Sequence, residues 1–245
     1  NDIQLVLEAV DFWIPQCYGA RIPTSIAERI PISSAMEVER TIPKIRELEK
    51  PFYAGLSAYG YVILYGRDGN LIELRGDVAL SDVSGRKEME LAATRTFRVD
   101  GKASEVRQEY RAKSDVVIDG LIIHAGETLV FDLPTAASLR ASARAVRENA
   151  GGALLGICLF RIPTERDKTT LSIEEISAAL DDREAELSTR IKLEARPDRQ
   201  LLITVENSGE VNSDSISIDL AVPLGSVNGV YGMSGFQDYQ TLCGI

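Results

Sequence analysis

A four-residue pattern, F-x-[IL]-P, occurs three times in this chain, each time at the end of an apolar stretch. The copies are residues 12–15, 131–134 and 160–163, and the last two are separated by about one strand and one helix. A repeat at this spacing predicts consecutive βα units whose strands form a parallel sheet. The pattern therefore favours an α/β fold with the architecture of a TIM barrel or part of one.

Side chains alternate across a strand, so the Phe and the Ile or Leu of each copy share one face and the middle residue lies on the other. In a (β/α)₈ barrel we expect the apolar pair to pack under the helices. The middle residues, Trp13, Asp132 and Arg161, would then point into the mouth of the barrel, where such folds place their sites.

The remaining patterns predict further elements of an α/β segment. Asp68-Gly69 between two apolar stretches predicts a β-hairpin inserted over residues 61–75. Apolar runs predict strands over residues 10–19, 52–58, 116–123, 128–133 and 153–161. Helices are expected over residues 34–50, 135–149 and 172–187, the first and last opening with capping boxes, with weaker helical patterns at 86–94 and 104–113.

The character of the sequence changes near residue 188. Apolar and polar residues alternate over 190–195, 200–206 and 215–222, with a turn at 207–209, as in half-buried antiparallel strands. We therefore predict two units: a TIM-barrel-like α/β domain over residues 1–187 and a small immunoglobulin-like β-sandwich module over 188–245.

Three stretches, VDFWIPQCYG, FYAGLSAYGYVILYGRDGNL and GETLVFDLPTAASLRASARAVRENAGGALLGICLFRIP, resemble the second half of an uncharacterised bacterial family of mostly exported, TIM-barrel-like proteins. The resemblance covers roughly residues 5–180. The family is similar to glycoside hydrolases by fold only. It implies an extracytoplasmic location: periplasmic, secreted or in the cell envelope. It also implies that the N-terminal half of the barrel precedes Asn1 or comes from another subunit.

Charge and hydropathy exclude several partners. Lys and Arg number 27 against 37 Asp and Glu, and a net charge of −10 repels nucleic acids and anionic lipid surfaces. No apolar run approaches the roughly 18–20 residues that span a bilayer, and the first residues show no targeting signal. We therefore expect neither nucleic-acid binding nor membrane insertion.

Cysteine and histidine usage argues against a metal centre. Cys17, Cys158 and Cys243 form no C-x-x-C pair, and His124 is the sole histidine, so a multi-histidine zinc site cannot be built. A Ser-His-Asp triad would have to use His124, which lies in a predicted turn. We expect no metal and no cofactor.

Asp132 is the carboxylate best placed for acid/base catalysis, with Glu127 and Asp11 as candidate partners, because glycosidases need two carboxyl groups at about 5–10 Å. The competing, structural interpretation is an ion pair between Asp132 and Arg161.

Trp13, Tyr18, Tyr59 and Tyr61 would form a wall against which the apolar C–H faces of sugar rings stack, while Gln16 bonds to hydroxyl groups. The competing interpretation is that these aromatic side chains pack between loops and helix ends.

The sequence thus predicts a carbohydrate-directed protein, with glycoside hydrolysis at the barrel mouth as its candidate activity. The alternative is a non-catalytic binding or structural module that holds a protein partner. A second carboxylate near Asp132 in a concave site would favour the enzyme.

Overall fold

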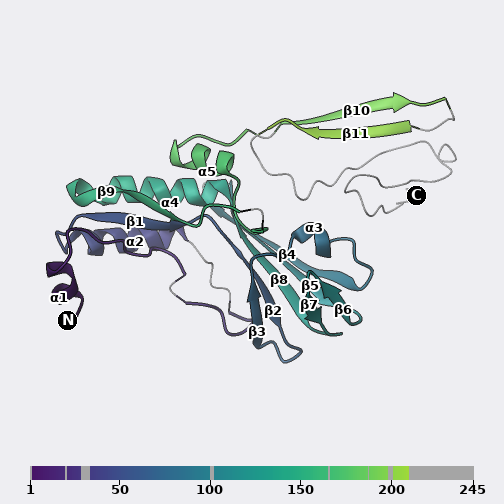
Figure 1. Ribbon diagram of the computed structural model, residues 1–245, viewed down its shortest axis with the longest axis horizontal. Helices are drawn as coiled ribbons and strands as arrows, with labels where there is room; N and C mark the ends of the chain where they lie inside the picture. Colours follow the sequence, from purple (N-terminus) through teal and green to yellow (C-terminus); the bar gives the residue numbers. More distant parts are fainter. Residues whose placement is uncertain are drawn as a thin grey trace.

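The computed structural model describes residues 2–19, 21–28, 34–99, 102–164, 166–186, 188–197 and 201–209. Within them the chain is a mixed α/β protein with two main parts (Figure 1). The first is a parallel unit of strands and helices. The second is a five-stranded antiparallel sheet, inserted in the chain between a strand and a helix of the first.

The parallel unit is built on β1 (Phe52–Ser57) and β9 (Leu154–Phe160), which pair in parallel with Ser57 opposite Phe160. Bridges from Trp13 to Phe52 and from Gln16 to Gly55 add the segment around residues 13–16 as a third parallel strand. The helices of this unit are α1 (Asp2–Glu8), α2 (Ala35–Arg46), α4 (Ala136–Asn149) and α5 (Ile173–Leu180), with a 3₁₀ turn η1 (Gly151–Ala153).

One face of the parallel strands packs against helices. Phe52 and Leu56 of β1 are fully buried with Ile42 of α2 and Leu139 of α4 in one apolar cluster. The helices form where expected: Thr135 accepts a bond from the Ser138 N–H at the start of α4, and Ser172 forms a capping box with Glu175 at the start of α5. Ser34, by contrast, makes no side-chain cap bond to α2.

The antiparallel sheet has the order β3-β2-β8-β5-β4. Its strands are β2 (Tyr61–Tyr65), β3 (Leu71–Arg75), β4 (Met89–Val99), β5 (Lys102–Ala112) and β8 (Thr128–Pro134). The short helix α3 (Leu80–Val83) and the hairpin of β6 (Val116–Ile118) and β7 (Leu121–Ile123) cover one of its faces.

The central strands of this sheet, β2 and β8, are covered on both faces. On one, Val62 and Phe131 pack with Val83 and Ile123. On the other, Ile63, Tyr65 and Val130 form a smaller cluster against Ile26.

Beyond α5, the strands β10 (Thr189–Ala195) and β11 (Leu201–Asn207) form an antiparallel hairpin that extends away from the other helices and strands (Figure 1). Its strands match the first two strands predicted for the sandwich module to within one residue at each end. The third predicted strand, over residues 215–222, lies outside the described residues, so the sandwich and the domain boundary near residue 187 stay predictions.

Several expectations are confirmed. The Asp68-Gly69 hairpin is β2–β3, and the predicted helices at 34–50, 135–149 and 172–187 correspond to α2, α4 and α5, although α5 ends at Leu180.

Two expectations are wrong. Residues 86–94 and 104–113 are not helices, because β4 and β5 run through them as paired strands. Residues 131–134 end β8, which is antiparallel to both of its neighbours, so this copy of the tetrapeptide does not close a βα unit. The described residues form part of a parallel α/β array, not a closed barrel.

Candidate functional site

Four aromatic rings gather where the parallel strands end and the antiparallel sheet begins: Tyr18, Tyr59, Tyr61 and Phe160. Tyr18 and Phe160 lie nearly parallel, with ring centroids 5.9 Å apart and planes 16° apart. Tyr59 meets both edge-on, with its centroid 6.2 Å from that of Tyr18 and 5.4 Å from that of Phe160. Tyr61 completes the aromatic cluster, edge-on to Tyr59 at 5.4 Å.

Strand alternation brings these rings together. Ser57 lies on the β1 face opposite the buried Leu56, and Phe160 is the ladder partner of Ser57. Tyr59 follows just beyond the end of β1. At Gly60 the chain passes from β1 to β2 of the antiparallel sheet, in close contact with the backbone of β8. A Cβ atom at Gly60 would lie 2.1 Å from the Asp132 carbonyl oxygen, a distance that no side chain tolerates.

Polar groups border the cluster. The Gln16 amide donates to the Tyr18 hydroxyl at 3.0 Å, and the Tyr59 and Tyr61 hydroxyls are 3.1 Å apart. The Arg161 guanidinium carbon lies 5.7 Å from the centre of the Tyr59 ring. Burial raises the pKa of Tyr59, and the bond with the Tyr61 hydroxyl raises it further.

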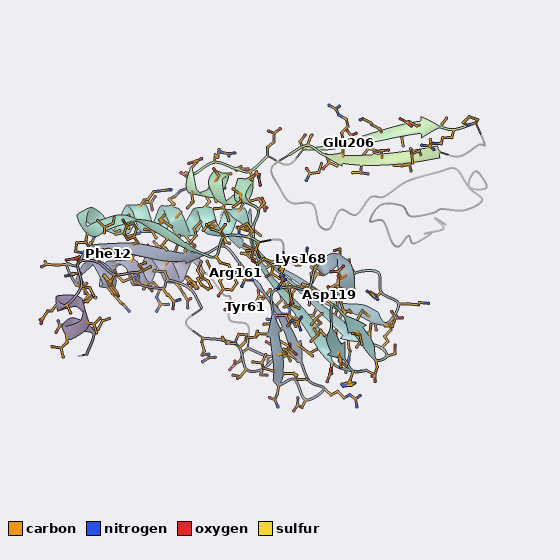
Figure 2. All side chains as sticks on the ribbon, in the orientation of Figure 1. Phe12, Tyr61, Asp119, Arg161, Lys168 and Glu206 are labelled. Carbon is orange, nitrogen blue, oxygen red and sulfur yellow. The ribbon has the colours of Figure 1, made fainter. Side chains whose placement is uncertain are left out.

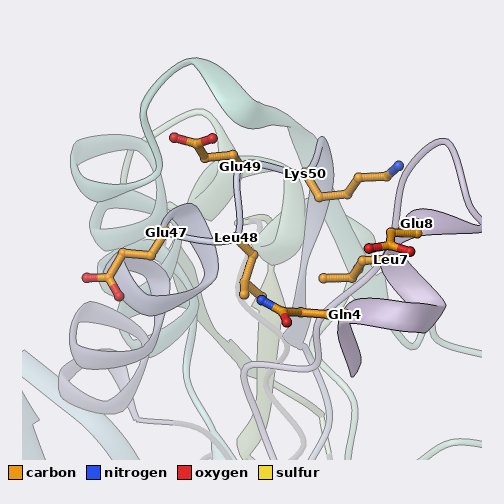
Figure 3. A pocket seen from close by; sticks show the side chains of 7 residues that line it. All are labelled: Gln4, Leu7, Glu8, Glu47, Leu48, Glu49 and Lys50. Atoms are coloured by element: carbon orange, nitrogen blue, oxygen red, sulfur yellow. The ribbon is translucent and has the colours of Figure 1, made fainter. Parts of the chain in front are cut away.

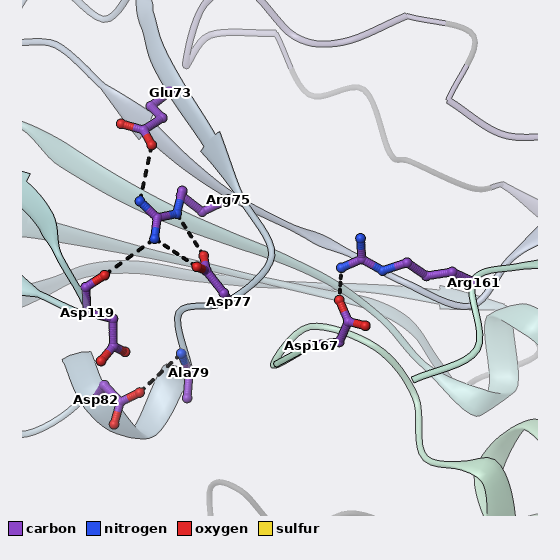
Figure 4. Close-up of polar contacts among 8 residues, drawn as sticks. All are labelled: Glu73, Arg75, Asp77, Ala79, Asp82, Asp119, Arg161 and Asp167. Carbon is purple, nitrogen blue, oxygen red and sulfur yellow. Dashed lines mark hydrogen bonds and ion pairs between the residues drawn. The ribbon is translucent and has the colours of Figure 1, made fainter. Parts of the chain in front are cut away.

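Arg161 is also fixed from its other side, by an ion pair with Asp167 (Figure 4). The Asp167 carboxylate in turn accepts bonds from the backbone and hydroxyl of Thr164. Figure 2 places Arg161 and Tyr61 at the junction of the two parts of the molecule, and Phe12 at the far end of the parallel unit.

Trp13 is not part of this cluster. It pairs with Phe52, the first residue of β1, at the opposite end of the strand, and it packs against the buried cluster under the helices. Its Nε1 is buried without a hydrogen-bond partner among the described residues. The predicted grouping of Trp13, Asp132 and Arg161 at one mouth is therefore wrong.

The predicted faces of the tetrapeptides are reversed in two of the three copies. Phe12 is 49% exposed and Phe160 is 48% exposed, and both lie on the face away from the helices. Ile14 and Ile162 are exposed as well. Within the part of the chain that the structure describes, no helix or strand covers this largely apolar face of the parallel sheet.

Asp132 lies on β8 and is only 4% exposed. Its ion-pair partner is Arg107, with 3.9 Å between Oδ2 and Nη1, so the predicted pairing with Arg161 is wrong. Burial raises the pKa of Asp132 to about 6, and the charge of Arg107 acts against that rise. An inaccessible carboxylate beside a guanidinium lacks the open position that catalysis requires.

The two carboxylates suggested as partners for Asp132 lie elsewhere. Glu127 accepts a bond from the His124 N–H at 2.8 Å and is five residues away along β8, roughly 17 Å at the rise of an extended strand. Asp11 is exposed and precedes Trp13, at the amino end of the parallel strands. The structure brings neither to Asp132.

Two residues of this region were missed from the sequence. The tetrapeptide pattern predicts that Phe160, the last residue of β9, packs under helices. Alternation between Leu159 and Phe160 is equally compatible with the opposite face. Arg107 was assigned to a helix, whereas the run of charged residues at every second position of β5 is typical of a strand.

Other regions of the molecule show weaker evidence of a functional site. A hollow of about 400 Å³ lies between α1 and the turn before β1, near Gln4, Glu8 and Lys50 (Figure 3). It is at the amino end of the strands, opposite the aromatic cluster. Among the described residues, no three His, Cys, Asp or Glu side chains converge as metal ligands would. The helices that the structure describes are all too short or too polar to cross a membrane.

Comparison with known proteins gives little further information. No protein-family model and no curated protein matches the sequence. Among solved structures, a chitinase from Rhizomucor miehei matches with a TM-score of 0.30 and 14% sequence identity. The match covers 74% of this chain and 55% of the chitinase chain, so the chain spans about half the length of that protein. A TM-score this low indicates neither a shared fold nor a shared activity.

Proposed function

We propose that this chain is a carbohydrate-directed protein that binds sugar at the aromatic cluster of Tyr18, Tyr59, Tyr61 and Phe160. The observation that carries the proposal is the corner formed by these rings at the strand ends, with two nearly parallel rings and a third set across them. Aromatic faces match the apolar C–H faces of pyranose rings.

Accessible polar groups at the cluster fit the same ligand. Gln16 is exposed, and its amide oxygen is available to accept a bond from a sugar hydroxyl while the amide nitrogen bonds to Tyr18. Phe160 is half exposed and the three tyrosines are partly exposed, so the rings are open to a ligand. A few well-placed polar groups beside an apolar surface are typical of small-ligand sites.

The test is calorimetry with a panel of soluble polysaccharides and oligosaccharides, comparing Phe160→Ala with Phe12→Ala. The two phenylalanines are equally exposed and lie on the same face of the sheet, but only Phe160 belongs to the aromatic cluster. We expect Phe160→Ala to weaken sugar binding about tenfold, or about 1.4 kcal/mol, and Phe12→Ala to leave it unchanged. Equal losses in both variants, or no binding to any sugar, would contradict the proposal.

Glycoside hydrolysis through Asp132 is the weaker candidate, because this carboxyl group is 4% exposed and paired with Arg107. Its pKa of about 6 suits a general acid only where a substrate reaches it. Hydrolysis of a bound oligosaccharide that is lost in Asp132→Asn, with binding retained, would support an enzyme. Binding without turnover at any pH would leave a binding module.

We further propose that another subunit covers the open face of the parallel sheet. Parallel strands are normally buried on both faces, yet Phe12, Ile14 and Leu155 are about half exposed here. The partner would also complete the surroundings of the aromatic cluster.

A further inference from the structure

Arg107 is a fully buried arginine outside the aromatic cluster. It lies on β5, is 1% exposed, and its guanidinium reaches three different elements. Nε donates to Glu109 on the same strand at 3.0 Å, Nη2 donates to the Ile26 carbonyl at 3.3 Å, and Nη1 faces Asp132 on β8 at 3.9 Å. Burying an arginine costs free energy unless its charge is paired. Its three contacts therefore indicate the function of this residue.

The contact with Ile26 attaches a connecting segment to the sheet. We call residues 21–28 the strap, and it begins three residues after Tyr18. Backbone bonds of 2.9 Å, from Ile26 N–H to Gly69 and from Leu71 N–H to Thr24, join it to the β2–β3 hairpin. The strap closes on itself through Glu28, which accepts a bond from the Thr24 N–H at 2.8 Å.

The contact with Asp132 connects Arg107 to the strand that pairs with Tyr61 of the aromatic cluster. Tyr61 on β2 and Arg107 on β5 are both ladder partners of Asp132 on β8, so the three form one row across the sheet. Residues in register on adjacent strands share a face. The row therefore runs from the cluster at Tyr61 to the buried guanidinium.

We propose that Arg107 is a positioning residue of the aromatic cluster, which fastens the strap behind Tyr18 and the strand beside Tyr61 to one buried guanidinium. This inference rests on the proposed function, because the aromatic rings need to be held in position only if they bind a ligand. The two tyrosines stand on different segments of the chain, and Arg107 contacts both the strap, at the Ile26 carbonyl, and Asp132.

The geometry requires an arginine. A guanidinium is a planar fork that directs donors toward several acceptors at once, whereas the ammonium of lysine is a single point on a flexible chain. Arg107→Lys therefore keeps the positive charge near Glu109 and Asp132 and loses the reach to Ile26. Arg75→Lys is a matched control, because Arg75 makes a comparable fork to Asp77 and Glu73 on the edge strand β3 (Figure 4). As the ladder partner of Val62, Arg75 lies on the face of the sheet opposite Tyr61.

Two measurements test the proposal. The first is trypsin cleavage of the native protein after Arg21, followed by mass spectrometry; the Arg21 side chain is exposed, so the rate of this cut reports release of the strap. The second is the affinity for whichever oligosaccharide the wild-type protein binds. Thermal unfolding establishes that each variant is folded.

We expect Arg107→Lys to raise the rate of the cut after Arg21 about tenfold and to weaken sugar binding about tenfold, while Arg75→Lys changes neither. A folded Arg107→Lys protein with the wild-type cutting rate and affinity would overturn the proposal. If that variant does not fold, Glu109→Gln decides: it removes the charge that anchors Nε, so faster cutting supports the proposal and an unchanged rate overturns it. Faster cutting without sugar binding by the wild-type protein would contradict the proposed function but support the attachment of the strap by Arg107.

Discussion

The parallel unit and the antiparallel sheet differ in how many of their faces are covered. In the antiparallel sheet, Phe131 on one face and Val130 on the other are both fully buried. In the parallel unit, Phe52 is fully buried under the helices while Phe12 and Ile14 on the opposite face are about half exposed. Antiparallel sheets tolerate an open face and parallel sheets rarely do, so the usual pattern is inverted here. The open parallel face is therefore where we expect this chain to meet ligands and partners.

The largest expected effect comes from removing a ring from the covered sheet. Phe131→Ala leaves a cavity between β8 and the layer that covers it, and it should lower the free energy of unfolding by about 3–5 kcal/mol. Phe12→Ala on the open face should cost less than about 1 kcal/mol. Urea unfolding of both variants measures the contrast, and equal losses would mean that the open face is covered in solution.

The next effect concerns the junction between the two parts. Gly60→Ala places a Cβ atom against the backbone of Asp132 and Leu133 and the ring of Pro134, which cannot move without breaking the β2–β8 ladder. We expect a loss of about 3 kcal/mol. Gly152→Ala is the control, because nothing lies within 4 Å of the added carbon. An unchanged free energy of unfolding in Gly60→Ala would show that Gly60 is not packed this closely against β8.

A smaller effect follows from the buried carboxylate of the antiparallel sheet. The pKa of Asp132 is about 6 in the folded protein, above the ordinary value of 3.8, so the folded state takes up this proton first as the pH falls. Its contribution to the free energy of unfolding therefore rises on acidification from pH 7 to 4.5, by about 2 kcal/mol at about 1.4 kcal/mol per pKa unit.

Other carboxylates titrate in the same range, so the difference between wild type and Asp132→Asn isolates this group. Denaturant unfolding at pH 7 and 4.5 should show wild type gaining about 2 kcal/mol relative to the variant at the lower pH. A pH-independent difference would place the pKa of Asp132 near its ordinary value.

The smallest effect on stability is expected on the open face itself. Ile14→Ser should change the free energy of unfolding by less than about 0.5 kcal/mol, because Ile14 is half exposed. The same change should reduce association between molecules, since contiguous exposed apolar surface favours it. Sedimentation velocity at several concentrations measures this. A wild-type protein that is monomeric throughout would contradict association through this face.

Local patterns in the sequence correctly predicted α2, α4, α5, the strands β1 and β9, and the hairpin at Asp68-Gly69. These elements depend on apolar periodicity, turn residues and, at α5, a capping box, all of which act over a few residues. The aromatic cluster was predicted in part: Tyr18, Tyr59 and Tyr61 come together, with Gln16 and Arg161 beside them, whereas Trp13 lies at the other end of its strand.

The errors share one cause, which is pairing between distant segments. The tetrapeptide at residues 131–134 ends an apolar strand like the other two copies, but β8 finds its partners in β2 and β5 and runs antiparallel to both. The charged residues of β5 look solvent-exposed in sequence, yet Arg107 is buried, with its charge paired to Glu109 and Asp132 and its Nη2 bonded to the Ile26 carbonyl.

By itself, the sequence determined which stretches become helices, strands and turns in the parallel unit, because propensity and periodicity are local properties. Tertiary structure alone decided that an antiparallel sheet is inserted between β1 and α4, which face of the parallel strands stays open, and that Asp132 meets Arg107 and not Arg161. Those outcomes depend on which surfaces are buried against each other, and burial is a property of the assembled chain.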